Sequence, residues 1–193
     1  MKKIILAIAL IMIIFQMVTL AIAIDIGSPA INRITSTATA AYTYVNKNNP
    51  ANDTGTITIV EIWAKTTIIN AEVATFFVVS GNNLSTRDYE FIGTVTAGAK
   101  RTFNVNLDVV TGDYIGIYKS VDGAIEKDYN GGDGYWFKVG DNIPCTNAAF
   151  TSTTDHIISL GGTGATVGWG HKWNTITIGK WNTTTFSKWN GLQ

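Results

Sequence analysis

The chain has 193 residues, enough for one domain of ordinary size. Only 15% of the residues are charged, below the roughly 25% usual in soluble domains, and 14 basic residues cancel 14 acidic ones, which argues against a general nucleic-acid-binding surface. A single cysteine, Cys145, excludes an intrachain disulfide framework and a cysteine-cluster zinc site, and two histidines leave little for a histidine metal site. This composition favours non-enzymatic surface roles.

The N-terminal segment has the pattern of a secretory signal peptide. Lys2 and Lys3 precede an almost continuous apolar run, and Ala21-Ile22-Ala23 has the small residues that signal peptidase reads. We therefore expect residues 1–23 to form a hydrophobic signal helix and the mature chain to start near Ile24. The alternative is an uncleaved membrane anchor, because about 20 apolar residues suffice to span a bilayer.

The mature chain begins with segments of two-residue period, which is typical of β-strands. Ile57 and Ile59 alternate with threonines, and the apolar face then continues on Val60 and Ile62, so a β-bulge is expected near Ile59–Val60. The segment 73–79 is nearly all apolar and predicts a central strand of a sandwich.

The next segment shows the alternation most clearly. Phe103, Val105, Leu107 and Val109 alternate with polar residues, so these four side chains are expected to face the core. Three further strands are predicted, at 114–118, 135–139 and 156–160.

Turn signals separate the strands at short intervals, because Gly and Asn reach positive φ at little cost. The expected turns are 49–50, 80–83, 97–98, 111–113, 122–123, 130–134 and 161–164. Eight or nine short strands with this spacing, and no amphipathic helix after residue 24, predict an all-β fold. We expect residues 24–164 to form a jelly-roll-like β-sandwich.

Residues 165–193 differ from this domain and contain an internal repeat of eight residues. Each unit begins Lys-Trp-Asn, at Lys172, Lys180 and Lys188. Four of the six tryptophans fall in this tail, at Trp169, Trp173, Trp181 and Trp189. Nine basic and fourteen acidic residues between 25 and 160 give a net charge of −5, whereas the tail carries three lysines and no acid. The tail is therefore complementary in charge to the domain.

An even repeat length puts Trp173, Trp181 and Trp189 on one face of an extended strand. Such a strand needs a partner for its backbone groups. Its own sandwich, a stack of short hairpins turning after each tryptophan, and a neighbouring subunit all remain open. We favour self-association, with these tryptophans, Trp169 and the three lysines as the assembly residues.

No arrangement of residues points to catalysis. The sequence has no G-x-S-x-G, no H-E-x-x-H and no histidine beside a candidate nucleophile. His156 and His171 are better explained as packed or surface residues. We therefore predict a protein that is not an enzyme and carries no cofactor.

The segment 128–136 contains candidate residues for two kinds of binding site. Asp128, Asn130 and Asp133 are candidate calcium ligands in a glycine-rich loop, but three oxygens fall short of the six to eight that calcium takes, so a plain turn is favoured. Tyr129, Tyr135 and Trp136 are candidate glycan-stacking residues. The competing interpretation is that one or more of these rings belongs to the core.

Short strand-and-turn segments recur between residues 25 and 164, at 25–27, 31–33, 48–51, 55–58, 92–98, 111–118 (TGDYIGIY), 125–128 and 158–160. With these segments, residues 25–164 resemble a group of phage- and metagenome-encoded β-sandwich proteins associated with virion or tail structure. The group also tends to end in short repeats of Lys, an aromatic or apolar residue and Asn-Gly, which Lys188-Trp189-Asn190-Gly191 matches. The resemblance implies a β-sandwich and brings no catalytic residues.

A signal peptide is a departure from that group, since a virion protein assembled in the cytoplasm does not need one. The sequence as a whole therefore predicts a secreted or cell-surface protein with a structural or adhesive role, whose main partner is itself. A carbohydrate-binding module is the alternative. Membrane contact is expected only through residues 1–23, if they stay uncleaved.

The first prediction concerns this processing. Because the apolar run ends in Ala21-Ile22-Ala23, the mature N-terminus should lie at Ile24 or within a few residues of it. Intact-mass measurement of the secreted protein checks this. A membrane-bound product that retains Met1 would instead support the anchor.

Overall fold

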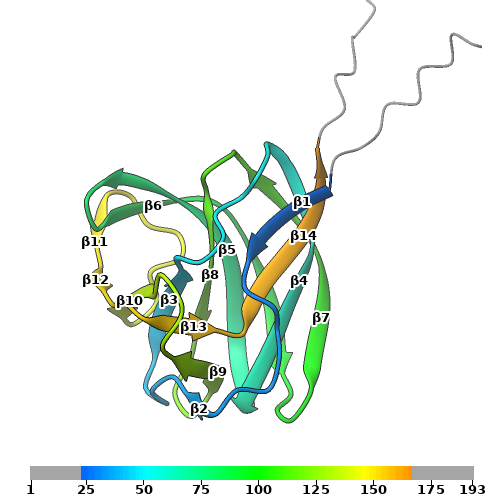
Figure 1. The fold of residues 1–193 in the computed structure, drawn as a ribbon, viewed down its shortest axis with the longest axis vertical. Helices are drawn as coiled ribbons and strands as arrows, with labels where there is room; N and C mark the ends of the chain where they lie inside the picture. Colours follow the sequence, from blue (N-terminus) through cyan, green and yellow to red (C-terminus); the bar gives the residue numbers. More distant parts are fainter. Residues whose placement is uncertain (1–22, 167–193) are drawn as a thin grey trace, which may run out of the picture.

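The computed structural model describes residues 23–166. These residues form fourteen β-strands and no helix, so the predicted all-β fold is confirmed. Within this range no helix is long and apolar enough to cross a membrane. The strands form two sheets that pack together as a sandwich closing toward a barrel (Figure 1).

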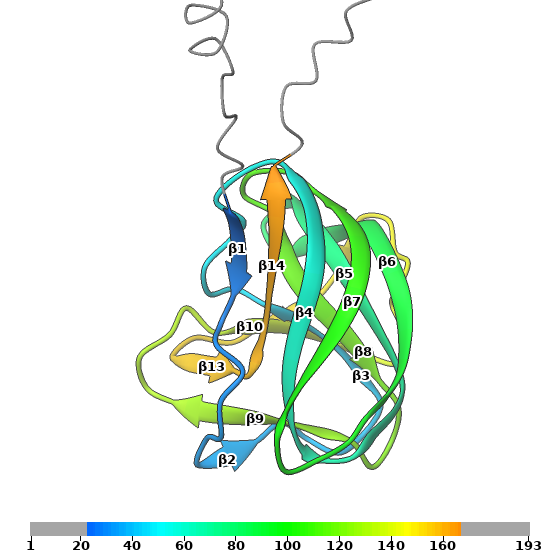
Figure 2. The same ribbon diagram turned by 90° about the vertical axis from the view of Figure 1, so that its right-hand side faces the viewer.

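The first sheet is built around the last strand of the domain. β14 lies between β1 and β4, and β7 pairs with the other side of β4, all antiparallel (Figure 2). Beyond the start of β14, β9 continues the sheet along β4 and pairs with β13 and β2. The strands are β1 (Ala23–Gly27), β2 (Thr35–Ser36), β4 (Gly55–Thr66), β7 (Lys100–Val109), β9 (Ala124–Tyr129), β13 (His156–Ile158) and β14 (Leu160–Thr166).

The second sheet has the order β11-β6-β5-β8-β3-β10-β12. Its two outermost strands, β11 and β12, belong to one short segment, 148–152, which therefore pairs with β6 at one edge and β10 at the other. The strands are β3 (Tyr42–Asn46), β5 (Ile68–Ser80), β6 (Asn83–Val95), β8 (Tyr114–Lys119), β10 (Tyr135–Val139), β11 (Ala148–Ala149) and β12 (Thr151–Ser152).

The main core lies between the sheets and contains three of the four side chains predicted on β7. Val105, Leu107 and Val109 are buried. Phe103 also packs against this core, as its face predicts, but it is only partly buried and not fully buried as expected. β7 pairs with a strand on one side only, so the side chain at this position is less completely covered.

The predicted bulge is present on β4, slightly before the expected position. The pairing with β7 shifts register between Ile57 and Ile59. Ile57 and Val60 are both buried, although they are an odd number of residues apart. The bulge is what allows both side chains to face the core.

One predicted turn is wrong. Residues 161–164 are not a loop but part of β14, and β14 continues to Thr166, two residues beyond the expected boundary. Its glycines serve close packing, since a Cβ atom on Gly161 would lie 2.6 Å from the carbonyl oxygen of Ser28. The other six predicted turns lie between strands.

Side chains cap the exposed edges of the first sheet. The Asp25 N–H on β1 donates to Oδ1 of Asn52 (2.9 Å), and Nδ2 of Asn52 donates back to the carbonyl of Ala23 (3.2 Å). On β7, the N–H groups of Asn106 and Asp108 donate to the carboxylates of Glu90 and Asp88 on β6. Such caps limit the pairing of the edges with further strands.

The core assignment predicts unequal effects of two truncations on β7. Leu107→Ala should lower the free energy of unfolding by about 2–5 kcal/mol, because it removes a completely buried side chain. Phe103→Ala should cost less, because solvent already reaches that ring. Urea unfolding of both variants checks this, and a larger loss for Phe103→Ala would contradict the placement of the two side chains.

Candidate functional site

Strand alternation separates two of the three candidate glycan-stacking residues, and the third lies on another strand. Tyr135 and Trp136 are neighbours on β10 and point to opposite faces of the second sheet. Tyr135 joins the core between the sheets, and Trp136 joins a second apolar cluster with Phe76 and Phe150. Both are buried, whereas Tyr129 is 51% exposed.

His156 connects two of these three residues. Its ring lies 5.1 Å from that of Tyr129 and 5.5 Å from that of Tyr135, measured between centroids. Tyr129 also carries the ammonium group of Lys127 at 4.5 Å from its ring centre. The cluster packs aromatic edges together and leaves one face of Tyr129 for solvent.

Of the candidate calcium ligands, Asp128 has protein partners for its carboxylate. The carboxylate of Asp128 accepts hydrogen bonds from Arg33 and from the N–H of Ile34, both at 2.9 Å. These bonds hold the pKa of Asp128 below its usual range. Asn130 adopts a positive φ in the turn, and no group of three or more acidic, His or Cys side chains among the described residues is placed to hold a metal.

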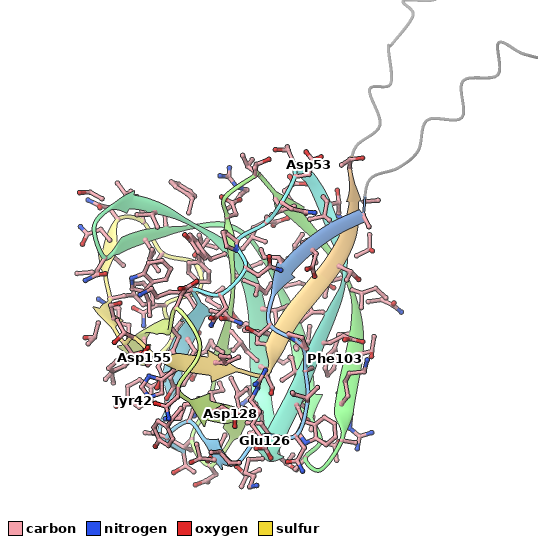
Figure 3. The ribbon with its side chains drawn as sticks, viewed as in Figure 1. Tyr42, Asp53, Phe103, Glu126, Asp128 and Asp155 are labelled. Carbon is pink, nitrogen blue, oxygen red and sulfur yellow. The ribbon has the colours of Figure 1, made fainter. Side chains whose placement is uncertain are left out.

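Arg33 belongs to a polar cluster in which its guanidinium has several partners. Its guanidinium also donates to the hydroxyl of Ser159 and the carbonyl of Pro29. Figure 3 shows Asp128 and the buried Glu126 in the same part of the domain. Every buried side-chain nitrogen and oxygen atom among the described residues has a partner. We infer that this cluster holds residues 29–34 against β9.

A cleft of about 620 Å³ does bring predicted residues together, one from each of the two candidate sites. Trp136 and Asp133 line it, and the other walls come from segments far apart in sequence. These lining residues are Lys47, Pro50, Tyr114, Gly132, Thr154 and Asp155. Its volume lies in the range of about 300–1,000 Å³ typical of ligand sites.

Trp136 forms the aromatic wall of the cleft and is fixed in place. Its Nε1 donates to Oδ1 of Asn82 over 2.9 Å, and Tyr114 packs edge-on at 4.9 Å. The ammonium group of Lys47 lies 5.4 Å from the centre of the Trp136 ring and donates to Ser152 and to the carbonyl of Thr153. The wall thus already combines an indole with a lysine.

Two acidic side chains stand at the rim of this cleft. Asp133 and Asp155 are both exposed. Their backbones are fixed, because the Asp133 N–H donates to Asn48 and the Asp155 carbonyl accepts from Asn130. Neither carboxylate has a hydrogen-bond donor among the described residues, so both are available to hydroxyl or ammonium groups of a ligand.

Sequence reasoning missed Lys47, Tyr114 and Asp155 as partners of Trp136. They lie in three separate loops and strand ends, and no spacing in the chain relates them. The chain between β9 and β14 brings residues 130–136 and 153–155 next to Lys47, which follows β3, and Tyr114, the first residue of β8.

The predicted assembly residues lie outside the described residues. They are Trp169, Lys172, Trp173, Lys180, Trp181, Lys188 and Trp189. Cys145 is described, is partly buried, and packs beside the second apolar cluster.

Comparison with known proteins adds no assignment. No protein-family model matches the chain, and no curated protein matches it.

A buried lysine lies apart from the cleft. Lys119 is completely buried, and its Nζ donates to the carbonyl of Ala40 over 2.6 Å near the ring of Tyr44. Burial lowers the pKa of Lys119 from 10.5 to about 8. Burial likewise raises the pKa of the Tyr44 hydroxyl. Because the Lys119 side chain is enclosed, we assign it to the core.

This burial predicts a pH dependence of stability. Between pH 8 and 10.5 the unfolded chain keeps a proton on Lys119 that the folded chain has released, so stability should rise with pH in this range. Lys119→Met should remove that rise. Urea unfolding at both ends of the range checks it, with Lys138→Met as the control, and an equal rise in the Lys119 variant would contradict the assignment.

Proposed function

We propose that this protein is an exported, non-enzymatic structural or adhesive protein of a cell or particle surface, which associates with copies of itself through the residues that follow β14, 167–193. One observation carries the proposal: three Lys-Trp-Asn units with no acidic residue follow a domain whose residues 25–160 have a net charge of −5. Tryptophan is the side chain most often found as an energetic anchor of interfaces.

We further propose that the domain is a jelly roll. Apart from β9, β10 and the strands of two or three residues, its eight strands are divided between the sheets in the orders β1-β14-β4-β7 and β3-β8-β5-β6. This is the double-sheet arrangement shared by capsid and lectin domains. It supports a surface role by analogy of fold alone, because a fold by itself does not specify function.

The place where the described chain ends is consistent with association away from the sheets. β1 and β14 pair from Ala23↔Ala165 to Gly27↔Gly161, so the described chain begins and ends at the same end of the domain (Figures 1 and 2). Because Asn52 caps β1 and acidic side chains cap β7, backbone pairing on these edges is disfavoured. We therefore expect the tail to bind through its side chains.

Carbohydrate binding is a second candidate, favoured by the cleft. Aromatic rings beside carboxylates and an ammonium group suit a polyhydroxylated ligand. Glycan-array binding that is lost on Trp136→Ala would support this function.

Truncation tests the first proposal. A chain ending at Thr166 keeps all of β14, which a chain ending at Gly164 would not, since Ala165 and Thr166 pair with Thr56 and Gly55. The truncated protein should remain folded and sediment as a monomer, whereas the full mature chain should form oligomers. The control is full-length protein with Trp173, Trp181 and Trp189 changed to alanine, which should also be monomeric.

Two results would contradict self-association through the tail. One is a full-length protein that is monomeric. The other is a truncated protein that forms oligomers of the same size as the full chain.

A further inference from the structure

The cleft around Trp136 has the chemistry needed to bind the repeat unit of the tail. It offers an aromatic wall of Trp136 and Tyr114 and two rim carboxylates, those of Asp133 and Asp155, with no donor among the described residues. Each repeat unit offers an ammonium group next to an indole. We propose that this cleft binds a Lys-Trp unit from the C-terminal repeats of a second copy of the chain. The inference rests on the proposed self-association and names its docking site.

A contact within the cleft has the same chemistry as this pairing. Lys47 already holds its ammonium group 5.4 Å from the centre of the Trp136 ring while donating to Ser152 and the Thr153 carbonyl. In the proposed complex, the incoming lysine donates to Asp133 and Asp155, and the incoming indole packs against Tyr114, the partly exposed ring of the aromatic wall.

Charge favours the tail over a neutral sugar as the occupant. Two carboxylates and one ammonium group leave the cleft with a net negative charge. The tail carries three lysines and no acid, and the domain from 25 to 160 is also acidic. Attraction between the basic tail and the acidic domain speeds association and is screened by salt.

The number of units favours a second copy over folding back onto the same domain. Residues 167–193 could reach about 90 Å when extended at roughly 3.3 Å per residue, so distance excludes neither. However, each chain has three Lys-Trp units, and its described domain offers one cleft of this composition. If a chain bound one of its units in its own cleft, two units would still be available to other copies. Contacts between chains are therefore expected in either case.

The test uses the full mature chain and sedimentation velocity. The double variant Asp133→Asn with Asp155→Asn keeps the shape of both side chains and should weaken self-association about tenfold or more. The matched control, Glu72→Gln with Asp122→Asn, removes the same charge outside the cleft and should assemble like the wild type. Equal thermal unfolding midpoints of the two variants establish that both are folded.

Mixing separates contacts between copies from contacts within one chain. The cleft variant is mixed with a tail variant in which Lys172, Lys180 and Lys188 are changed to glutamine. Each alone should be largely monomeric, and the mixture should form complexes, because one partner supplies the tail and the other the cleft. A synthetic peptide of residues 179–190 should dissolve wild-type assemblies, and the same peptide with both tryptophans changed to alanine should not.

The outcomes distinguish this inference from the proposed function. If the wild type assembles and the Asp133, Asp155 variant assembles equally well, the docking site is wrong while tail-mediated association stands. A wild-type protein that is monomeric overturns both. If the peptide has no effect but a glycan binds and loses affinity in the cleft variant, the cleft is a sugar site and the inference is wrong.

Discussion

The rest of the structure depends on the insertion of β14 between β1 and β4. This strand is the last of the described domain, and it pairs with β1 on one side and β4 on the other. The approach is close enough that a Cβ atom on Gly161 would contact the backbone of Ser28. Glycine is required here for packing within a sheet rather than for a turn.

That insertion also fixes where the two ends of the domain lie. Because β1 is antiparallel to β14, a segment after Thr166 leaves beside the start of β1. Figure 3 shows Asp53 at this end of the domain, whereas Asp155, on the rim of the cleft, lies well away from it. The end of the described chain and the cleft therefore lie on different parts of the domain.

Side-chain caps on the sheet edges bear on how such copies could join. Asn52 bonds to β1 much as a neighbouring peptide group would, and Asp88 and Glu90 occupy N–H groups of β7. The segment 148–152 covers both edges of the second sheet. These caps reduce aggregation through strand pairing. An interface made of side chains in a cleft remains compatible with all of them.

Lys119 and Arg33 show two ways of burying a positive charge. Lys119 has no acidic partner, whereas Arg33 forms an ion pair with Asp128. Arg33 reaches Asp128, Ser159 and Pro29 at once, whereas Lys119 has the Ala40 carbonyl and the Tyr44 ring. The ion pair compensates the charge of Arg33, whereas burial lowers the pKa of the Lys119 ammonium group. Neither group lines the cleft around Trp136, where the carboxylates of Asp133 and Asp155 are available to a ligand.

The sequence by itself determined the all-β class, most strands and turns, the bulge on β4 and the buried face of Val105, Leu107 and Val109, because alternation and turn residues are local signals. Only the tertiary structure decided that residues 161–164 form a central strand, since a glycine that permits close packing looks like a glycine that permits a turn. It likewise separated Tyr135 from Trp136 and joined Trp136 to Lys47, Tyr114 and Asp155. Those contacts join segments distant in the chain, and local sequence patterns carry no information about which distant segments pack together.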